Sequence, residues 1–272
     1  MQGMKEFIPT EKKAAYINAL LRVGFNTLDF GSFVSPKAIP QMADTEAVLQ
    51  QLAWQQSKTK LLAIVANTRG AESAAQHEGI RCLGFPLSVS ETFQQRNTNR
   101  SVNEALYTLE EIKNICLTNK KELVVYISMG FGNPYGDAYH VDMVYAFTDK
   151  LVQLGADVIS LADTLGAATP QDITTLFTAM ARHCNVPLGV HLHTKAEDAL
   201  AKIDAAYRAG CRRMDGALKG FGGCPMAADE LVGNVATETI VQYAKANNVP
   251  LHMDMQALSE ALAMANEIFL KH

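Results

Sequence analysis

Short runs of β-branched and apolar residues alternate with longer amphipathic runs along almost the whole chain. The short runs have the pattern of strands and cover residues 25–30, 60–66, 80–87, 122–129, 157–163, 187–193 and 211–217. The amphipathic runs have the pattern of helices and include residues 10–24, 44–56, 102–119, 138–155, 170–184, 196–210 and 228–248. Regular alternation predicts a parallel sheet, and this many units in 272 residues favour a (β/α)8 barrel over an open doubly wound sheet.

The predicted barrel is one strand short. The first helical run begins near Thr10, so the preceding segment has no room for both a strand and a loop. A barrel that lacks one strand has two open edges, which proteins seldom leave uncovered. The sequence therefore predicts an α/β protein of the TIM (β/α)8 type whose first strand is missing or truncated. We expect one domain over residues 1–272, with an accessory C-terminal helix at 254–270.

The composition of the chain indicates which kinds of binding partner and which cellular location to expect. Hydrophobic residues make up 48% of the chain, which is ordinary for a globular protein, and the formal net charge is -4. That balance predicts no nucleic-acid or membrane partner, since both need a basic face. The odd number of cysteines, without a C-x-x-C pair, indicates a reducing compartment. Because no run is apolar enough to span a membrane and no signal peptide is recognisable, we expect a cytoplasmic location.

The stretch "VHLHTK" places His191 and His193 two residues apart at the end of a predicted strand. Two residues are one side-chain period of a strand, so both imidazoles point to the same face and form half of a metal site. An isolated His-x-His is at least as often a strand end whose histidines hydrogen-bond to neighbours. The rest of the chain has to decide between these readings.

Polar residues from further strands are predicted to meet the two histidines. In a TIM barrel the chemistry gathers at the C-terminal ends of the strands. The polar residues near those ends are Asp29, Tyr126, Ser160, Asp163 and Asp215. A single one of them, such as Ser160, is as easily a core hydrogen-bonding residue as a ligand contact. Their convergence favours a site, because a buried carboxylate needs a partner and a metal or substrate supplies one.

Two loops add candidates. The glycine-rich loop "GFGGCPMAADELVGN" carries Cys224, which is either incidental or a thiol that a mobile lid delivers as an acid or base. Asn234 is predicted to open the following helix, where it acts as a cap or offers a carbonyl oxygen to a metal. The loop "SFVSPKAIPQMAD" contains Lys37, which suits an anionic ligand.

Seven segments resemble the family of hydroxymethylglutaryl-CoA lyases, metal-dependent barrel enzymes that break carbon–carbon bonds. They are "SFVSPKAIPQMAD", "SETFQQRNTNRSVNEAL", "GNPYG", "VISLADTLGAATP", "VHLHTK", "GFGGCPMA" and "GNVATE". They occur in family order over nearly the whole chain. The combination is specific, although no single segment is.

The resemblance implies a reaction and a set of residues. The reaction is retro-Claisen cleavage of a 3-hydroxyacyl-CoA, such as 3-hydroxy-3-methylglutaryl-CoA to acetoacetate and acetyl-CoA. By resemblance, the ligands of a divalent metal, Mg2+ or Mn2+, are His191, His193 and Asn234. The implied catalytic residues are Cys224, Asp163, His191, Asp29 and Tyr126. The implied substrate-binding residues are Gln2, Ser160, Lys37 and Asn97. The base is either Asp163 or His191, with Cys224 as the acid, and the family implies a homodimer.

Some positions depart from the family pattern. Gln2 matches the last residue of the family's Arg-Asp-x-x-Gln motif, whose arginine and metal-binding aspartate would precede Met1. Either the working protein is longer, which we favour, or the chain is a defective relative. Thr194 and Lys202 stand where the family usually has aspartate and asparagine, which weakens the expected surroundings of the metal. Asp29 replaces a glutamate and is one methylene shorter.

Three alternatives remain at this stage. The chain is a lyase or aldolase for another hydroxyacyl-CoA or hydroxy acid, since the shape of the pocket sets that choice. It is a metal-dependent hydrolase of the amidohydrolase type, which also uses His-x-His but on the first strand. It is a protein that keeps the fold without the catalysis.

Overall fold

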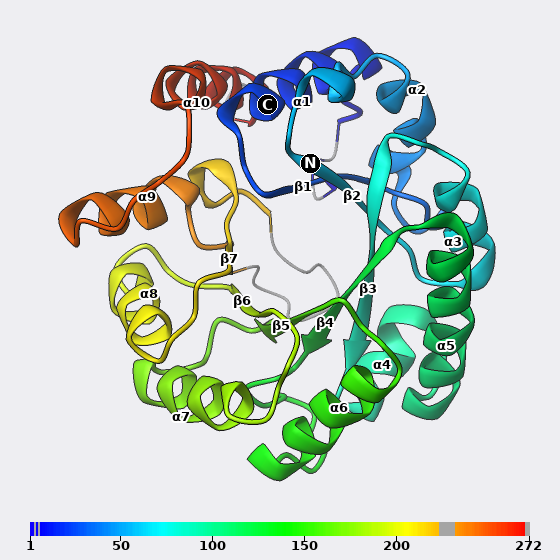
Figure 1. The fold of residues 1–272 in the computed structure, drawn as a ribbon, viewed down its shortest axis with the longest axis vertical. Coiled ribbons are helices and arrows are strands. Elements are labelled where there is room, and N and C mark those ends of the chain that lie inside the picture. The colour runs from blue at the N-terminus through cyan, green and yellow to red at the C-terminus, as the bar shows by residue number, and fades with distance from the viewer. Residues whose placement is uncertain (3, 5, 223–231, 270–272) are drawn as a thin grey trace.

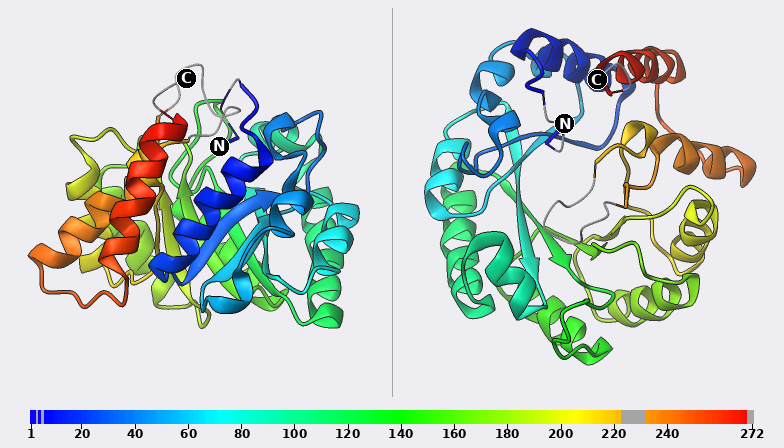
Figure 2. Two further views of the ribbon diagram at one scale, coloured as in Figure 1. Left: turned by 90° about the horizontal axis from the view of Figure 1, so that it is seen from above. Right: turned by 180° about the vertical axis from the view of Figure 1, so that it is seen from behind.

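The structure is a computed structural model that describes residues 1, 2, 4, 6–222 and 232–269 (Figure 1). Its strands form one sheet in chain order, and every neighbouring pair is parallel. They are β1 (Thr27–Ser32), β2 (Lys60–Ile64), β3 (Ile80–Ser88), β4 (Glu122–Ser128), β5 (Val158–Asp163), β6 (Leu188–Leu192) and β7 (Met214–Asp215). The seven predicted strands are confirmed. The sheet curls into an incomplete barrel with the helices on its outer face (Figures 1 and 2).

The helices follow the strands in the expected alternation. They are α1 (Thr10–Val23), α2 (Thr45–Leu49), α3 (Thr68–Ala75), α4 (Glu91–Thr98), α5 (Val102–Asn119), α6 (Val141–Gln153), α7 (Pro170–Ala181), α8 (Ala199–Arg208), α9 (Thr237–Ala246) and α10 (Met255–Phe269). Short 3-10 turns are η1 (Pro40–Met42), η2 (Trp54–Gln56) and η3 (Leu218–Gly220). The predicted C-terminal helix is confirmed as α10, which packs beside α1 (Figure 2).

Local sequence explains where two of the longer helices begin. Ser101 and Glu104 form a capping box at the start of α5, so each satisfies an amide that the first turn leaves free. Thr169 and Asp172 do the same for α7, and Pro170 occupies its first position, where a missing N–H costs nothing. These caps fix the point at which the chain leaves each preceding loop.

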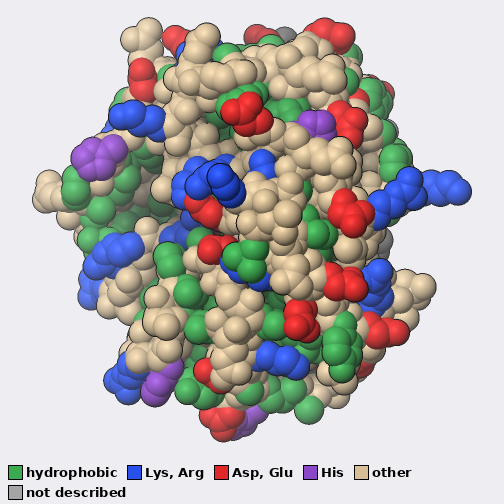
Figure 3. All heavy atoms as spheres, turned by 45° about the vertical axis from the view of Figure 1, so that its right-hand side comes forward, with side chains coloured by type: hydrophobic (Ala, Val, Ile, Leu, Met, Phe, Trp, Pro, Cys, Tyr) green, Lys and Arg blue, Asp and Glu red, His purple; other side chains and the backbone are tan. Residues whose placement is uncertain are grey.

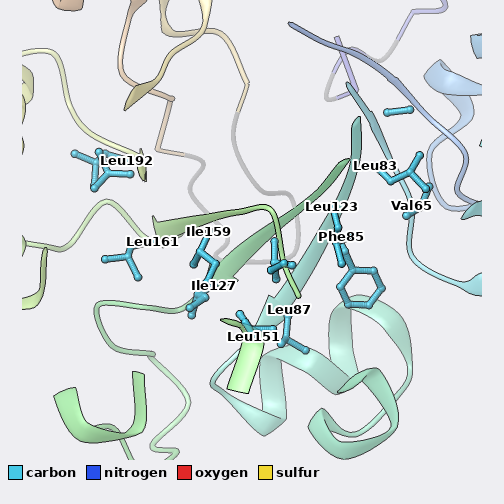
Figure 4. Close-up of a cluster of buried hydrophobic side chains, with 14 of the residues drawn as sticks. Val65, Leu83, Phe85, Leu87, Leu123, Ile127, Leu151, Ile159, Leu161 and Leu192 are labelled. Atoms are coloured by element: carbon cyan, nitrogen blue, oxygen red, sulfur yellow. The ribbon is translucent and has the colours of Figure 1, made fainter. Parts of the chain in front are cut away.

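The main core lies between the sheet and the helices. Along β3 the alternating residues Leu83, Phe85 and Leu87 are fully buried and face the helix layer (Figure 4). The opposite face of the sheet carries a smaller apolar cluster inside the barrel, which consists of Leu62, Cys82, Val124 and Val158. Because successive side chains of a strand point to opposite faces, this second face is the one that places polar groups within the barrel.

The curled sheet ends at β1 and β7, and within the part of the chain that the structure describes these two strands do not pair with each other. Met1, Met4 and Leu28 of β1 pack against an apolar cluster that contains Leu218, close behind β7. The expected TIM-type architecture with one strand fewer is thus confirmed.

Two expectations about helices were wrong. The helix predicted over 44–56 ends at Leu49 and is followed by the separate turn η2. The helix predicted over 228–248 begins only at Thr237, and Asn234 lies in an extended segment instead of capping it. The cause is a long-range contact, because Asn234 pairs with His193 across the chain. The short helices α3 and α4 were not predicted at all.

The surface carries charges of both signs. On the face shown in Figure 3, Lys and Arg side chains are interspersed with Asp and Glu, without one extended patch of a single sign. Among the residues described, no helix is both long and apolar enough to cross a membrane.

Candidate active site

Five strands bring polar side chains together inside the barrel. Asp29, Tyr126, Ser160, His191 and Asp215 come from β1, β4, β5, β6 and β7. Asp215 is the centre of the group, because its Oδ2 lies 3.3 Å from His191 Nδ1 and accepts a hydrogen bond from Ser160 Oγ at 3.3 Å. The ring of Tyr126 meets that of His191 edge-on, with centroids 5.6 Å apart. The predicted convergence is confirmed for these five residues.

His193 and Asn234 meet just beyond the end of β6. The two residues form an isolated antiparallel bridge. The amide of Asn234 donates to Gly220 O at 3.1 Å, and the amide of Val235 donates to Leu192 O at 3.1 Å. These bonds hold the extended segment against β6. Gly222 allows the close approach, since a Cβ there would lie 2.7 Å from Asn234 Nδ2.

The polar contacts of these residues suit a divalent metal. His191 Nδ1 faces Asp215, and His193 Nδ1 lies 3.0 Å from Val232 O. A proton on each Nδ1 satisfies these acceptors and leaves each Nε2 lone pair free as a ligand. Asn234 donates from Nδ2 to Phe221 O at 3.2 Å, and among the described residues its Oδ1 accepts no hydrogen bond. The two imidazole centroids are 5.4 Å apart. Two nitrogens and an amide oxygen are therefore available on one side of the barrel.

Burial sets the protonation of His193. Desolvation, followed by the neighbouring His191, lowers the pKa of His193 to about 4. The imidazole is thus neutral near pH 7, the form that binds metals. Within the described ranges, no three His, Cys, Asp or Glu side chains are grouped closely enough to hold a metal ion.

The two carboxyl groups inside the barrel have different environments. Desolvation within the barrel raises the pKa of Asp29 above its ordinary value, although part of the side chain remains open to solvent. Burial opposes ionisation of Asp215, but the hydrogen bond and charge of His191 outweigh it, and the pKa of Asp215 lies below its ordinary value. Burial, with both carboxylates nearby, raises the pKa of Tyr126, so its hydroxyl stays protonated.

Asp163 lies apart from this group. It is the last residue of β5 and, three positions after Ser160, points to the opposite face of the sheet. Its side chain is 2% exposed and forms an ion pair with Lys202 Nζ at 3.1 Å. Its two oxygens also accept hydrogen bonds from the amides of Ala167 and Ala168, each at 3.1 Å. The contacts of Asp163 are those of a residue that orders the loop after β5.

The remaining predicted residues are dispersed. Lys37 is exposed in the loop between β1 and α2, Asn97 is half-buried on α4, and Gln2 is exposed. Cys224 lies outside the described residues. The structure does not test the predicted roles of these four residues.

Two residues of the site were missing from the predicted set. Asp215 was noted at a strand end but given no role, although its parity on β7 places it beside His191. Lys202 was treated only as a departure from the family pattern. Its signal was its place on the apolar face of α8, where it shares the buried side with Ala199, Ile203 and Ala206.

The chain is similar to known proteins over nearly its whole length. The sequence profile of the family described as HMGL-like matches residues 1–265. The chain belongs to this family. It is 32% identical over 268 residues to a hydroxymethylglutaryl-CoA lyase of Bacillus subtilis, covering 98% of this chain and 89% of the relative. It is 31% identical to an (R)-citramalyl-CoA lyase of Chloroflexus aurantiacus, covering 96% of this chain and 85% of the relative.

Solved structures of HMGL-like proteins share the fold. An HMG-CoA lyase of Acinetobacter baumannii, in complex with coenzyme A and 3-methylmalate, superposes with a TM-score of 0.92 at 30% identity, covering 100% of this chain and 88% of that one. The HMG-CoA lyase of Bacillus subtilis gives 0.91 at 31% identity, with coverage of 98% and 89%. The seven-stranded sheet thus corresponds to the barrel of these lyases.

Proposed function

We propose that the chain is a divalent-metal-dependent lyase that cleaves a 3-hydroxyacyl-CoA, with 3-hydroxy-3-methylglutaryl-CoA giving acetyl-CoA and acetoacetate as the first candidate. The observation that carries the proposal is the arrangement of His191, His193 and Asn234, whose ligating atoms are left free beside the carboxyl groups of the barrel. The names of relatives support the substrate class, because similar proteins of Bacillus subtilis, Pseudomonas mevalonii and Rattus norvegicus are named hydroxymethylglutaryl-CoA lyases.

The metal site is proposed from the ligand set. The two imidazole nitrogens and the amide oxygen are a mixed nitrogen and oxygen set that accepts Mg2+ or Mn2+. A bound divalent ion supplies Lewis-acid stabilisation of the substrate oxygens. Asp215 orients the ring of His191, and Val232 O orients that of His193, so both rings are fixed before a ligand arrives.

Proton transfer needs one base and one acid. With His191 committed to Asp215 through Nδ1, and Asp163 held in its ion pair, we assign the base to Asp29. Asp29 is accessible to solvent and lies inside the barrel, close enough to His191 and Asp215 for their charges to act on its pKa. We assign the acid that protonates the departing enolate to Cys224. Tyr126 and Ser160 border the same space and are proposed to contact the substrate, with Gln2, Lys37 and Asn97 around the thioester.

A second substrate has a specific observation in its favour. The (R)-citramalyl-CoA lyase of Chloroflexus aurantiacus is about as similar to this chain as the hydroxymethylglutaryl-CoA lyases are. Both substrate names describe a branched hydroxyacid held as a CoA thioester. The amidohydrolase alternative loses its support, because the chain belongs to the HMGL-like family.

A thioester panel tests the proposal. Acetyl-CoA release is measured with Mn2+ from 3-hydroxy-3-methylglutaryl-CoA and from (R)-citramalyl-CoA, with the Asp29→Asn variant as control. We expect the first substrate to be cleaved faster and the variant to be impaired by about 100-fold or more. Faster cleavage of the second substrate reassigns the activity. Failure of both substrates with Mn2+ bound contradicts the proposed lyase activity.

A homodimer and a cytoplasmic location complete the proposal. They are supported by the resemblance to the family and by the cysteine content of the sequence, respectively. Light scattering of the purified chain measures its oligomeric state directly.

A further inference from the structure

Lys202 is the most enclosed cation beside the proposed metal site. It lies in the first turn of α8, and its side chain is 4% exposed. Its ammonium donates to Asp163 Oδ2 at 3.1 Å, to Gly166 O at 2.8 Å and to His193 O at 3.1 Å. An ammonium has three N–H bonds, so these acceptors use its full capacity. A lysine is seldom buried this completely unless each donor is satisfied.

The three acceptors belong to three separate segments at the mouth of the barrel, the end at which the C-terminal ends of the strands lie. Asp163 ends β5, Gly166 lies in the loop that follows, and His193 comes directly after β6. Asp163 in turn accepts the amides of Ala167 and Ala168, so the loop is fastened to the same centre. Gly166 also packs closely on His193, where an added Cβ would lie 3.2 Å from its carbonyl oxygen. One side chain therefore connects the loop after β5 to the backbone of a proposed metal ligand.

The position of the His193 imidazole depends on these contacts. On one side Lys202 holds its carbonyl, and its amide donates to Asp163 O at 3.2 Å. On the other side Val232 O holds its Nδ1. The ring has few remaining ways to turn, because main chain and side chain are both restrained.

We propose that Lys202 is a positioning residue, which fixes His193 in the orientation that binds the divalent metal. This inference rests on the proposed function, since it presupposes metal binding at His193. It also gives Asp163 a purpose. As the counter-ion of Lys202, Asp163 makes the burial of that ammonium possible and orders the loop, without a role in proton transfer.

The test has to separate positioning from charge balance. Lys202→Met keeps the length of the side chain but leaves the Asp163 carboxylate buried without its cation, which destabilises the fold. The double variant Asp163→Asn/Lys202→Met removes both charges and leaves the main-chain bond between His193 and Asp163 in place. Replacing both partners of a buried ion pair by neutral groups is often nearly neutral for stability.

The chain provides a matched control at the other end of the same strand. Lys113 Nζ lies 2.9 Å from Asp157 Oδ2, just before β5 and remote from the histidines. The corresponding double variant is Asp157→Asn/Lys113→Met. Each protein is examined by thermal unfolding and by titration with Mn2+ alone, in which electron paramagnetic resonance measures the free ion.

We expect both double variants to unfold within a few degrees of the parent chain. The Kd for Mn2+ rises by about 10-fold to 100-fold in Asp163→Asn/Lys202→Met and stays unchanged in the control. An unchanged Kd in Asp163→Asn/Lys202→Met overturns the inference and makes Lys202 a charge-balancing residue only. Equal weakening in both double variants overturns it as well, since the effect is then not specific to Lys202. Failure of the parent chain to bind Mn2+ is a different result, because it overturns the metal site itself and this inference with it.

Discussion

The strand β5 has a lysine–aspartate ion pair at each end, and the two pairs differ in their surroundings. At the start, Lys113 and Asp157 have side chains that are 12% and 39% exposed. At the end, Lys202 and Asp163 are 4% and 2% exposed, at nearly the same separation of charges. The first pair lies where water screens it. The second is enclosed and bound to the backbone of His193. The pair whose burial costs more desolvation energy is thus the one next to the proposed metal site.

The same contrast holds for the two ends of the barrel. At the base, Glu122 takes two contacts of 2.8 Å from Lys60 Nζ and lies 3.5 Å from Arg81 Nε. The two cations share one carboxylate, and all three side chains bind within the group. At the mouth, Asp215 and His191 hold each other while leaving an imidazole nitrogen free. In TIM barrels the base contributes stability and the mouth contributes function, and here the polar contacts divide in the same way.

The largest expected effect comes from removing a proposed ligand at the mouth. His193→Ala should weaken Mn2+ binding by more than about 100-fold, because loss of a ligand exceeds loss of a group that only orients one. Unfolding should change little. His183→Ala serves as the control, because it removes an imidazole from the surface of the protein. The ring centroids of His183 and Tyr145 are 5.1 Å apart there. Equal Mn2+ binding in both variants and the parent would remove His193 from the site.

The comparison of the two ion pairs predicts a large difference in stability. Lys202→Met should lower the free energy of unfolding by about 3 to 5 kcal/mol, because it leaves a buried carboxylate uncompensated. Lys113→Met breaks a more exposed pair and should cost about 1 kcal/mol or less. Urea denaturation of both variants measures the difference. Equal losses would show that burial does not distinguish the two ends of β5.

A smaller effect is expected at the interior carboxylate. Asp215→Asn removes the charge that orients His191, and Mn2+ affinity should fall by about 10-fold. The matched change at the base is Glu122→Gln, which should leave Mn2+ affinity unaltered. Titration calorimetry with Mn2+ compares the two. A response to Glu122→Gln alone would contradict the division between base and mouth.

The smallest expected effect is a pH-dependent change in stability at Asp137, in the loop after β4. Asp137 accepts hydrogen bonds from Ser90 and from the amide and hydroxyl of Thr92, which hold its pKa below the ordinary value. A depressed pKa stabilises the fold above the unfolded value of about 3.9, and the gain is lost as pH falls through the folded pKa. Asp137→Asn should therefore lower Tm by a few degrees at pH 7, and the deficit should shrink below pH 4. A deficit independent of pH would exclude the charge as its source.

Local patterns predicted most of the fold and part of the site. The strands were predictable because each is a short run of β-branched and apolar residues between longer amphipathic runs, and strand parity placed Asp29, Tyr126 and His191 on one face. The pairing of Asn234 with His193 was not predictable, because 41 positions separate them and the segment looks helical by itself. The ion pair of Lys202 with Asp163 was equally hidden, since the sequence does not show which buried cation meets which carboxylate.

The central claim is that the residues at the mouth belong to a hydroxyacyl-CoA lyase. The most direct test is cleavage of 3-hydroxy-3-methylglutaryl-CoA, with Mg2+ or Mn2+ added, by two proteins assayed side by side. One is this chain, and the other is the His193→Ala variant. We predict that this chain releases acetyl-CoA and acetoacetate in equal amounts and that the variant is slower or inactive. If this chain binds the metal and does not cleave the thioester, the substrate assignment is wrong.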